Sequence, residues 1–198
     1  MTFGSPFPKG RVAFFMTTNF NKFNEIRPVL AEYKVATAFL RIKTTEIQND
    51  DIENVAKAKS IEAAKNYNLP IMVEDAGIFI ENLNGFPGPY SSYVYRTLGT
   101  KGILKLMKDI DKRNAYFRSV IAFYDPEINL LKCFHGKIEG RISWEERGHL
   151  GFGFDPIFEP LKSNNTFAEM TMPEKNKCSH RAEALRKFAI WYVSSFSR

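Results

Sequence analysis

Two neighbouring carboxylates, Glu74 and Asp75, follow directly after the apolar run Pro70-Ile-Met-Val73. The run predicts a strand that delivers both acidic side chains to its end. Carboxylates beside a buried strand are unfavourable unless a cation or a metal ion neutralises them. Hard oxygen ligands suit Mg²⁺, which in turn binds substrate phosphates. The pattern therefore indicates either a metal site, with Glu46 as a third candidate carboxylate, or an ordinary ion pair or helix cap at a strand exit.

A second polar group, Thr17-Thr18-Asn19 followed by Lys22, stands where an expected strand passes into a helix. The N-terminus of a helix presents free N–H groups and the positive end of its dipole, so it favours phosphate. The hydroxyl and amide groups would add donors, and Lys22 would add a charge. The glycines of a Walker loop are absent from this motif. Read alone, it is more typical of a plain helix cap with a lysine in solvent.

A third motif is Gly151-Phe152-Gly153-Phe154-Asp155-Pro156, in which small residues flank two aromatic rings and one carboxylate. Such a loop can present a ring for stacking on a nucleobase and an acceptor for a hydrogen bond. A tight turn whose rings belong to the core would have the same pattern.

A fourth group, Lys175, Ser179, His180 and Arg181, gathers at the expected start of the last helix. These side chains could bind an anion or the polar edge of a base. A capped helix with a solvated basic face is the alternative. Cys178 and His180 are only two residues apart, so their side chains diverge on a helix or a strand and no Cys–His dyad is expected.

An alternation of strands and helices must position these groups. Apolar periodicity and capping residues predict strands over 11–16, 35–42, 70–73, 115–124 and 130–144 (the last as one strand or a hairpin), and helices over 21–33, from Asp50 or Asp51 to Tyr67, 100–109, and from near Ser179 to Trp191. Residues 83–90 are dense in turn residues and form a shaped loop. The expected fold is α/β: an elongated mixed sheet with flanking helices, shared by two lobes.

Length and composition restrict the class of protein. The 198 residues suit one domain over 11–198, or two closely packed lobes, preceded by a loose leader over 1–10 that lacks the apolar stretch of a signal peptide. No apolar run is long enough to span a bilayer. Two isolated cysteines indicate a reducing cytosol with neither a disulfide framework nor a zinc site. The net charge of +6 favours anionic partners, but the basic residues form no dense stripe of the kind that binds nucleic acid.

Together and in order, these motifs resemble the inosine/xanthosine triphosphate pyrophosphatase family. The matching stretches are 17–22, 73–78, 83–91, 151–156, 166–170 and 174–181. Ala76 stands where the family often has Ser or Thr, and Phe154 where it often has Tyr or Trp. The resemblance implies a cytoplasmic homodimer with the active cleft between two lobes. It also implies a Mg²⁺ requirement, with Mn²⁺ as a substitute, and hydrolysis of ITP, dITP and XTP to nucleoside monophosphate and pyrophosphate.

The resemblance also implies roles for particular residues. Asp75 would be the catalytic carboxylate that helps to activate water, with Lys22 and Glu46 assisting. The metal ligands would be Glu46, Glu74 and Asp75. The triphosphate would be held by Thr17, Thr18, Asn19, Lys22 and Lys59, with Lys57 as the alternative to Lys59. The base pocket would be formed by Phe152, Phe154, Asp155, Lys175, Ser179, His180 and Arg181. A related enzyme for modified pyrimidine nucleotides is the alternative, against which residues 175–181 argue by resemblance only.

Overall fold

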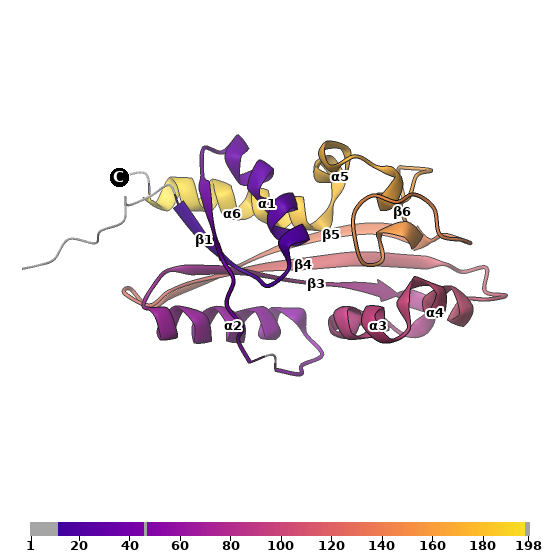
Figure 1. The fold of residues 1–198 in the computed structure, drawn as a ribbon, viewed down its shortest axis with the longest axis horizontal. Coiled ribbons are helices and arrows are strands. Elements are labelled where there is room, and N and C mark those ends of the chain that lie inside the picture. The colour runs from indigo at the N-terminus through magenta and orange to yellow at the C-terminus, as the bar shows by residue number, and fades with distance from the viewer. Residues whose placement is uncertain (1–11, 46, 197–198) are drawn as a thin grey trace, which may run out of the picture.

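The computed structural model describes residues 12–45 and 47–196, which contain a six-stranded mixed sheet with helices on both faces (Figure 1). The strands lie in the order β2-β1-β3-β4-β5-β6. β1 pairs in parallel with β2 and β3, and the pairs from β3 to β6 are antiparallel. The predicted elongated mixed sheet with flanking helices is confirmed. The expected leader over 1–10 lies outside the described residues.

The strands are β1 (Val12–Met16), β2 (Ala36–Leu40), β3 (Ile71–Ile80), β4 (Asn114–Asp125), β5 (Leu130–Ile142) and β6 (Phe158–Pro160). The helices are α1 (Phe20–Glu32), α2 (Ile52–Tyr67), α3 (Ser91–Thr97), α4 (Gly99–Leu106), α5 (Met172–Cys178) and α6 (His180–Phe196). Short 3₁₀ turns cover Glu81–Leu83, Gly88–Tyr90, Asp155–Ile157 and Phe167–Glu169. Because β5 pairs with β4 along its whole length, residues 130–142 form one strand and not a hairpin.

The two long N-terminal helices begin and end at residues suited to those places. Asn19 caps α1, and Asp51, not Asp50, caps α2 by accepting the N–H of Glu53 at 3.0 Å. α2 ends at Tyr67, and the next residue, Asn68, has a left-handed backbone (φ 51°), which is a common way to stop a helix. These helices follow the predicted bounds closely because their caps are local signals.

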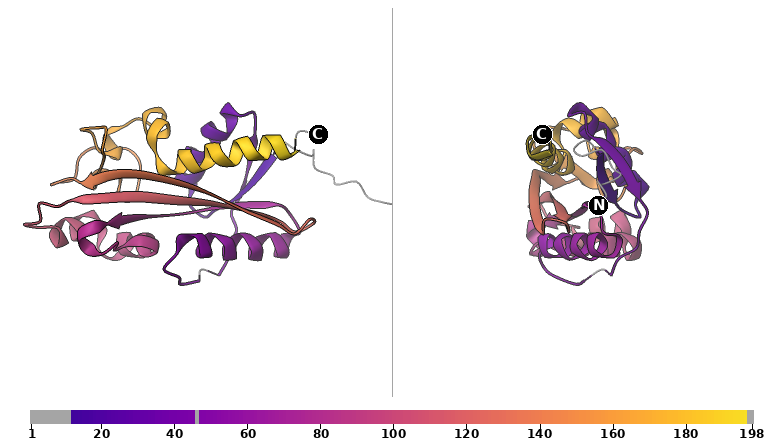
Figure 2. Two further views of the ribbon diagram at one scale, coloured as in Figure 1. Left: turned by 180° about the vertical axis from the view of Figure 1, so that it is seen from behind. Right: turned by 90° about the vertical axis from the view of Figure 1, so that its left-hand side faces the viewer.

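Apolar side chains on the two faces of the sheet pack against different helices. Ala13, Phe15 and Met72 pack with α1 and α6 in one buried cluster, and Ile71 and Val73 pack with α2 in another. Figure 2 shows α6 and α2 on opposite sides of the long strands. A third cluster, around Ile78, Phe117 and Phe158, holds α3, α4 and β6 at the far end. None of the described helices is long and apolar enough to cross a membrane.

β3 differs from the sequence prediction, which ended the strand at Val73. It continues to Ile80 because β4 pairs with it over the whole length, from Ile71↔Tyr124 to Ile80↔Ala115. On its other edge, β1 pairs with it only as far as Val73. Glu74 and Asp75 therefore lie inside a strand and not at its end. Since successive side chains of a strand point to opposite faces, these two carboxylates diverge.

Candidate active site

A cleft of about 640 Å³ opens where β1 ends, beside the part of β3 that β1 no longer pairs. Its walls come from the segment between β1 and α1, from α2, β3 and α3, from residues 152–155 and from the start of α6. Figure 1 shows how far apart along the chain these elements are. The sheet topology thus brings the four polar groups singled out in the sequence to one place.

The segment Thr17–Lys22 lines one wall of the cleft. The side chain of Asn19 accepts the backbone N–H groups of Asn21 at 2.9 Å and Lys22 at 3.2 Å, and Thr17 accepts the N–H of Asn19 at 3.1 Å. These N–H groups are therefore satisfied internally. What the helix start offers an anion is its dipole, the hydroxyl of Thr18, the amide NH₂ of Asn19 and the charge of Lys22.

Asp75 points to the face of the sheet that α2 covers. The Nζ of Lys59, on α2, lies 3.8 Å from Asp75 Oδ1, and each side chain is 14% exposed. Both residues line the cleft. Lys57 instead forms an ion pair with Glu53 on the same helix and is not part of the cleft wall. Of the two candidate lysines, Lys59 is the one beside the cleft, next to the predicted catalytic carboxylate.

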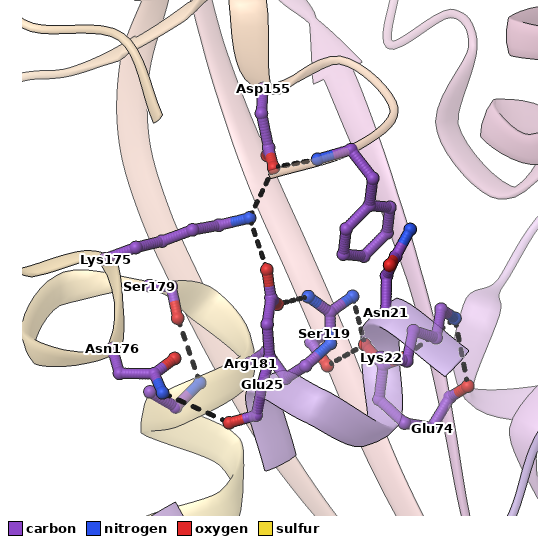
Figure 3. Close-up of polar contacts among 12 residues, drawn as sticks. Asn21, Lys22, Glu25, Glu74, Ser119, Asp155, Lys175, Asn176, Ser179 and Arg181 are labelled. Carbon is purple, nitrogen blue, oxygen red and sulfur yellow. Dashed lines mark hydrogen bonds and ion pairs between the residues drawn. The ribbon is translucent and has the colours of Figure 1, made fainter. Parts of the chain in front are cut away.

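Glu74 points the other way, towards α1 and α6, and its side chain is completely buried (Figure 3). Lys22 Nζ lies 2.7 Å from its Oε2 and also donates to its backbone oxygen at 3.3 Å. Arg181 Nη2 lies 3.1 Å from Oε1, to which Ser119 donates at 2.7 Å. Burial acts to raise the pKa of Glu74, but Arg181 and Lys22 outweigh it, and the net pKa lies well below 4.5. The two cations therefore favour the ionised form of this carboxylate.

The ion pairs continue from Arg181 towards residues 151–156, here called the aromatic loop (Figure 3). Arg181 also pairs with Glu25 on α1, whose other oxygen lies 2.7 Å from Lys175 Nζ. Lys175 in turn lies 2.5 Å from Asp155 Oδ2. The result is an alternating series of buried charges, here called the charge chain: Lys22, Glu74, Arg181, Glu25, Lys175 and Asp155. It connects Lys22, at the start of α1, to the aromatic loop.

For Glu25, Asp155 and Arg181, the balance between burial and neighbouring charges sets the direction of the pKa shift. Burial acts to raise the pKa of Glu25, but Arg181 and Lys175 outweigh it, so its net pKa is lowered. For Asp155, burial outweighs the attraction of Lys175, and the pKa is raised. For Arg181, burial acts to lower the pKa, but Glu74 and Glu25 outweigh it, so the guanidinium stays charged.

Asp155 orders the aromatic loop by accepting the backbone N–H of Phe152 at 2.8 Å. Gly151 allows this contact, because a Cβ at this left-handed position (φ +72°) would collide with the Asp155 carboxylate. The Phe152 ring lies 5.5 Å from the Arg181 guanidinium. Phe154 is buried and packs edge-on against Tyr95 of α3 at 5.5 Å. Phe152 is thus the half-buried ring of the loop at the cleft, and Phe154 supports it.

His180 lies at the cleft beside Arg181. Its ring stacks on Phe117, with centroids 4.6 Å apart and planes 8° from parallel. Burial, with Arg181 next in size, holds the pKa of His180 well below 6.5, so the imidazole is neutral. Its Nδ1 and Arg181 Nε are buried atoms with no hydrogen-bond partner within the described chain. Two unpaired polar atoms at a cleft suggest a ligand that pairs with them.

Some predicted site residues lie elsewhere. Lys175 and Ser179 are buried and do not line the cleft. Lys175 is held between two carboxylates, and the hydroxyl of Ser179 accepts the N–H of Ala182 at 3.2 Å at the start of α6. Glu46 lies outside the described residues, so its predicted part in catalysis and metal binding stays a prediction.

Sequence reasoning missed Glu25 and Ser119. Each carried a signal: Glu25 stands beside Ile26 on the buried side of α1, and Ser119 alternates with Phe117 and Ile121 on a buried face of β4. A polar residue within an apolar pattern has to find a partner. Glu25 finds its partners Lys175 and Arg181 within the charge chain, and Ser119 donates to Glu74 of that chain.

The predicted metal site fits these residues only in part. Within 12–45 and 47–196, no group of three His, Cys, Asp or Glu side chains is arranged to hold a metal ion. Asp75 offers a carboxylate at the cleft. Glu74 does not fit beside it, because it points to the opposite face and its oxygens already contact Lys22, Arg181 and Ser119. The prediction that Glu74 and Asp75 bind one ion together disagrees with this geometry.

Comparison with known proteins gives a consistent picture. The model of the Ham1 family matches residues 13–191. A relative from Methanopyrus kandleri, named dITP/XTP pyrophosphatase, is 44% identical over 181 residues, which is 91% of this chain and 96% of the relative. A relative of the same name from Saccharolobus solfataricus is 45% identical over 179 residues, covering 90% and 92% of the two chains. Among solved structures, a HAM1 protein from Coxiella burnetii superposes with a TM-score of 0.81 at 30% identity, over 93% of this chain and 99% of the other.

Proposed function

The chain belongs to the Ham1 family, and from this premise we propose that it is a pyrophosphatase for non-standard purine nucleoside triphosphates. It converts ITP, dITP and XTP into the nucleoside monophosphate and pyrophosphate, and so removes deaminated purines from the nucleotide pool. The observation that carries the proposal is the cleft itself. One end has Lys22, Lys59 and Asp75, and the other has an aromatic ring and two unpaired polar atoms. The relatives' name, dITP/XTP pyrophosphatase, agrees with it.

The phosphate end fits hydrolysis between the α- and β-phosphates. Asp75 would accept a proton from the attacking water, whose oxygen forms the new bond to the α-phosphorus. The bond to the bridging oxygen breaks, and pyrophosphate leaves. Lys22 and Lys59 neutralise the triphosphate, and the α1 dipole adds to their field. Both lysines are mostly buried, with side chains 17% and 14% exposed, so their attraction for phosphate is weakly screened.

A divalent cation, Mg²⁺ with Mn²⁺ as a substitute, belongs to the proposal. Asp75 is the described residue that would hold it, with Glu46 as the further candidate ligand. When bound, such an ion polarises the phosphoryl oxygens and lowers the pKa of bound water. A homodimer and a cytoplasmic location complete the proposal.

The base end fits a 6-keto purine. Arg181 Nε is a buried donor without a partner in the described chain, and the keto oxygen of hypoxanthine or xanthine is an acceptor. The neutral His180 can present Nδ1 as donor or acceptor, according to its tautomer. Adenine carries an amino donor at position 6, so it would leave the buried Arg181 donor unpaired. Phe152 offers a face for stacking that serves every purine about equally, so it adds affinity but little discrimination.

Product analysis tests the proposal. ITP, XTP, ATP, GTP and modified pyrimidine triphosphates are each incubated with the protein, with and without Mg²⁺. Pyrophosphate and monophosphate are expected from ITP and XTP, only in the presence of the metal ion. Orthophosphate with a diphosphate intermediate would contradict the assigned bond. A preference for a pyrimidine substrate would favour the alternative enzyme class.

A further inference from the structure

We propose that Glu74 is a positioning residue and not a metal ligand: its buried carboxylate holds Lys22 and Arg181 together and so links the phosphate end of the cleft to the base end. The inference deepens the proposed function and rests on it, since it concerns the same cleft and the same substrate class.

The first support comes from strand geometry. Glu74 and Asp75 are both in regular register with β4, opposite Ile121 and Val120. Neighbouring residues of a strand point to opposite faces. Asp75 accordingly meets Lys59 of α2, and Glu74 meets Lys22 of α1. One ion cannot be shared by both carboxylates while β3 keeps this register.

The second support is that the oxygens of Glu74 are already engaged. Oε2 forms an ion pair with Lys22 at 2.7 Å but has no hydrogen-bond partner within the described chain, and Oε1 contacts Arg181 and Ser119 within 3.1 Å. The side chain has no exposed surface. A metal ion at this carboxylate would have to displace a cation that the site needs for its substrate, so the contacts favour a counter-ion.

The third support is the position of its two partners. Lys22 lies at the predicted phosphate end, and Arg181 lies beside His180 and Phe152 at the predicted base end. Glu74 anchors Lys22 through both its side chain and its backbone oxygen. It shares Arg181 with Glu25, so the guanidinium is fixed from two sides. Removing the charge of Glu74 would free Lys22 and let Arg181 move towards Glu25. One substitution should then impair both phosphate binding and base choice.

The experiment uses Glu74→Gln, which removes the charge and changes the volume little. Catalytic efficiency is measured for ITP and ATP, and Mn²⁺ binding to the nucleotide-free protein is measured by calorimetry. The catalytic efficiency for ITP should fall by about tenfold to hundredfold, the effect of losing one charged hydrogen bond. The ITP-to-ATP preference should fall by about tenfold by the same reasoning. Mn²⁺ affinity should stay close to that of the unmodified chain, whereas Asp75→Asn should weaken it.

Glu159→Gln is the matched control. Glu159 is also a buried carboxylate shared by two cations, Arg141 and Arg147, but it lies on β6 outside the cleft wall. Its substitution should leave the nucleotide preference and Mn²⁺ affinity unchanged. If Glu74→Gln fails to fold, Ser119→Ala replaces it, since it removes one hydrogen bond to the same carboxylate. It should lower the ITP-to-ATP preference in the same direction by a smaller factor.

Loss of Mn²⁺ affinity in Glu74→Gln, with the nucleotide preference intact, would overturn the inference and make Glu74 a ligand. An equal change of preference in Glu159→Gln would also overturn it, because the effect would then be one of general stability. Failure of the unmodified protein to release pyrophosphate from ITP would instead refute the proposed function. The metal titration contains no nucleotide, so it would still decide whether Glu74 binds the ion.

Discussion

Replacing Lys175 with methionine tests which of two roles Lys175 has: a structural role in the charge chain, or direct contact with a base. Lys175 is 3% exposed and lies between Glu25 and Asp155. Methionine keeps most of the side-chain volume and apolar contact but removes the charge and three donors. The substitution leaves Glu25 with Arg181 alone and leaves Asp155 with no cation among its described ion pairs. We expect the main effect to be on folding stability.

The magnitude follows from burial. Removing one partner of a buried ion pair commonly destabilises a protein by about 3–5 kcal/mol, because the remaining charge stays buried. For a chain of this size each kcal/mol lowers the melting temperature by roughly 2–4 °C, so a decrease of about 6–20 °C is expected at pH 7. Because Lys175 is deeply buried, solvent screens its ion pairs only weakly.

The effect should depend on pH with a definite sign. Lys175 lowers the pKa of both Glu25 and Asp155, whose ordinary values are 4.5 and 3.8. Without it both folded-state pKa values rise, and the folded variant binds more protons than the folded wild type. A folded state that binds more protons loses stability as pH rises. The stability difference should therefore shrink as pH falls through the pKa values of Glu25 and Asp155, and it should reach its full value above the raised pKa values of the variant.

The assay is denaturant unfolding followed by circular dichroism from pH 4 to pH 8. Lys187→Met is the control, since Lys187 pairs with Glu183 on the surface of α6 with side chains 53% and 44% exposed. That change should cost less than about 1 kcal/mol at every pH. A loss below about 1 kcal/mol for Lys175→Met at pH 7, or a loss that does not vary with pH, would refute the buried-pair reasoning.

Four further predictions concern activity. Asp75→Asn should abolish pyrophosphate release while the circular dichroism spectrum stays native; activity within a few-fold of wild type would exclude Asp75 as the catalytic carboxylate. Lys22→Ala should reduce kcat/KM by about tenfold to hundredfold, the value of a charged contact to phosphate, and an unchanged kcat/KM would show that Lys22 does not meet the substrate. The wild type should prefer ITP and XTP to ATP by up to roughly 10⁴-fold, because a mismatched base leaves buried donors unpaired. Arg181→Ala, checked for folding, should reduce the ITP rate far more than the ATP rate, and equal wild-type efficiency on ITP and ATP would refute base reading.

Helix starts and the mixed architecture could be predicted from the sequence because their causes are local. Asn19 and Asp51 cap helices through contacts within three residues of themselves. α3 and α5 were not predicted, since each has seven residues and too few turns to show a period. The end of β3 was predicted wrongly because two charged residues interrupt its apolar pattern. Pairing with a distant strand, β4, carries it on to Ile80.

The candidate site also has parts that could be predicted from the sequence and parts that could not. The motifs Thr17–Lys22 and Phe152–Asp155 at the cleft were predicted because each is contiguous in the sequence. Other residues of the cleft wall, such as Tyr95 and Arg96, were not. The charge chain was not, since it joins residues such as Glu25 and Lys175 that are 150 positions apart. From the sequence alone, Lys175 is a basic residue near the expected start of a helix. Only the fold shows that Lys175 forms ion pairs with two buried carboxylates and does not line the cleft.

The divergence of Glu74 and Asp75 has a consequence for how this chain tolerates insertions and deletions. A single residue added to or lost from the first half of β3 would exchange the two side chains between faces. Asp75 would then meet the cations of α1 and α6, and Glu74 would meet Lys59. Both acidic groups would survive in the sequence, yet the carboxylate proposed as catalytic would leave the cleft for the interior. Length changes in the segment before Ile71 can be absorbed by a loop. An insertion or deletion of one residue between Ile71 and Asp75 should abolish activity, although the sequence motif would still be recognisable.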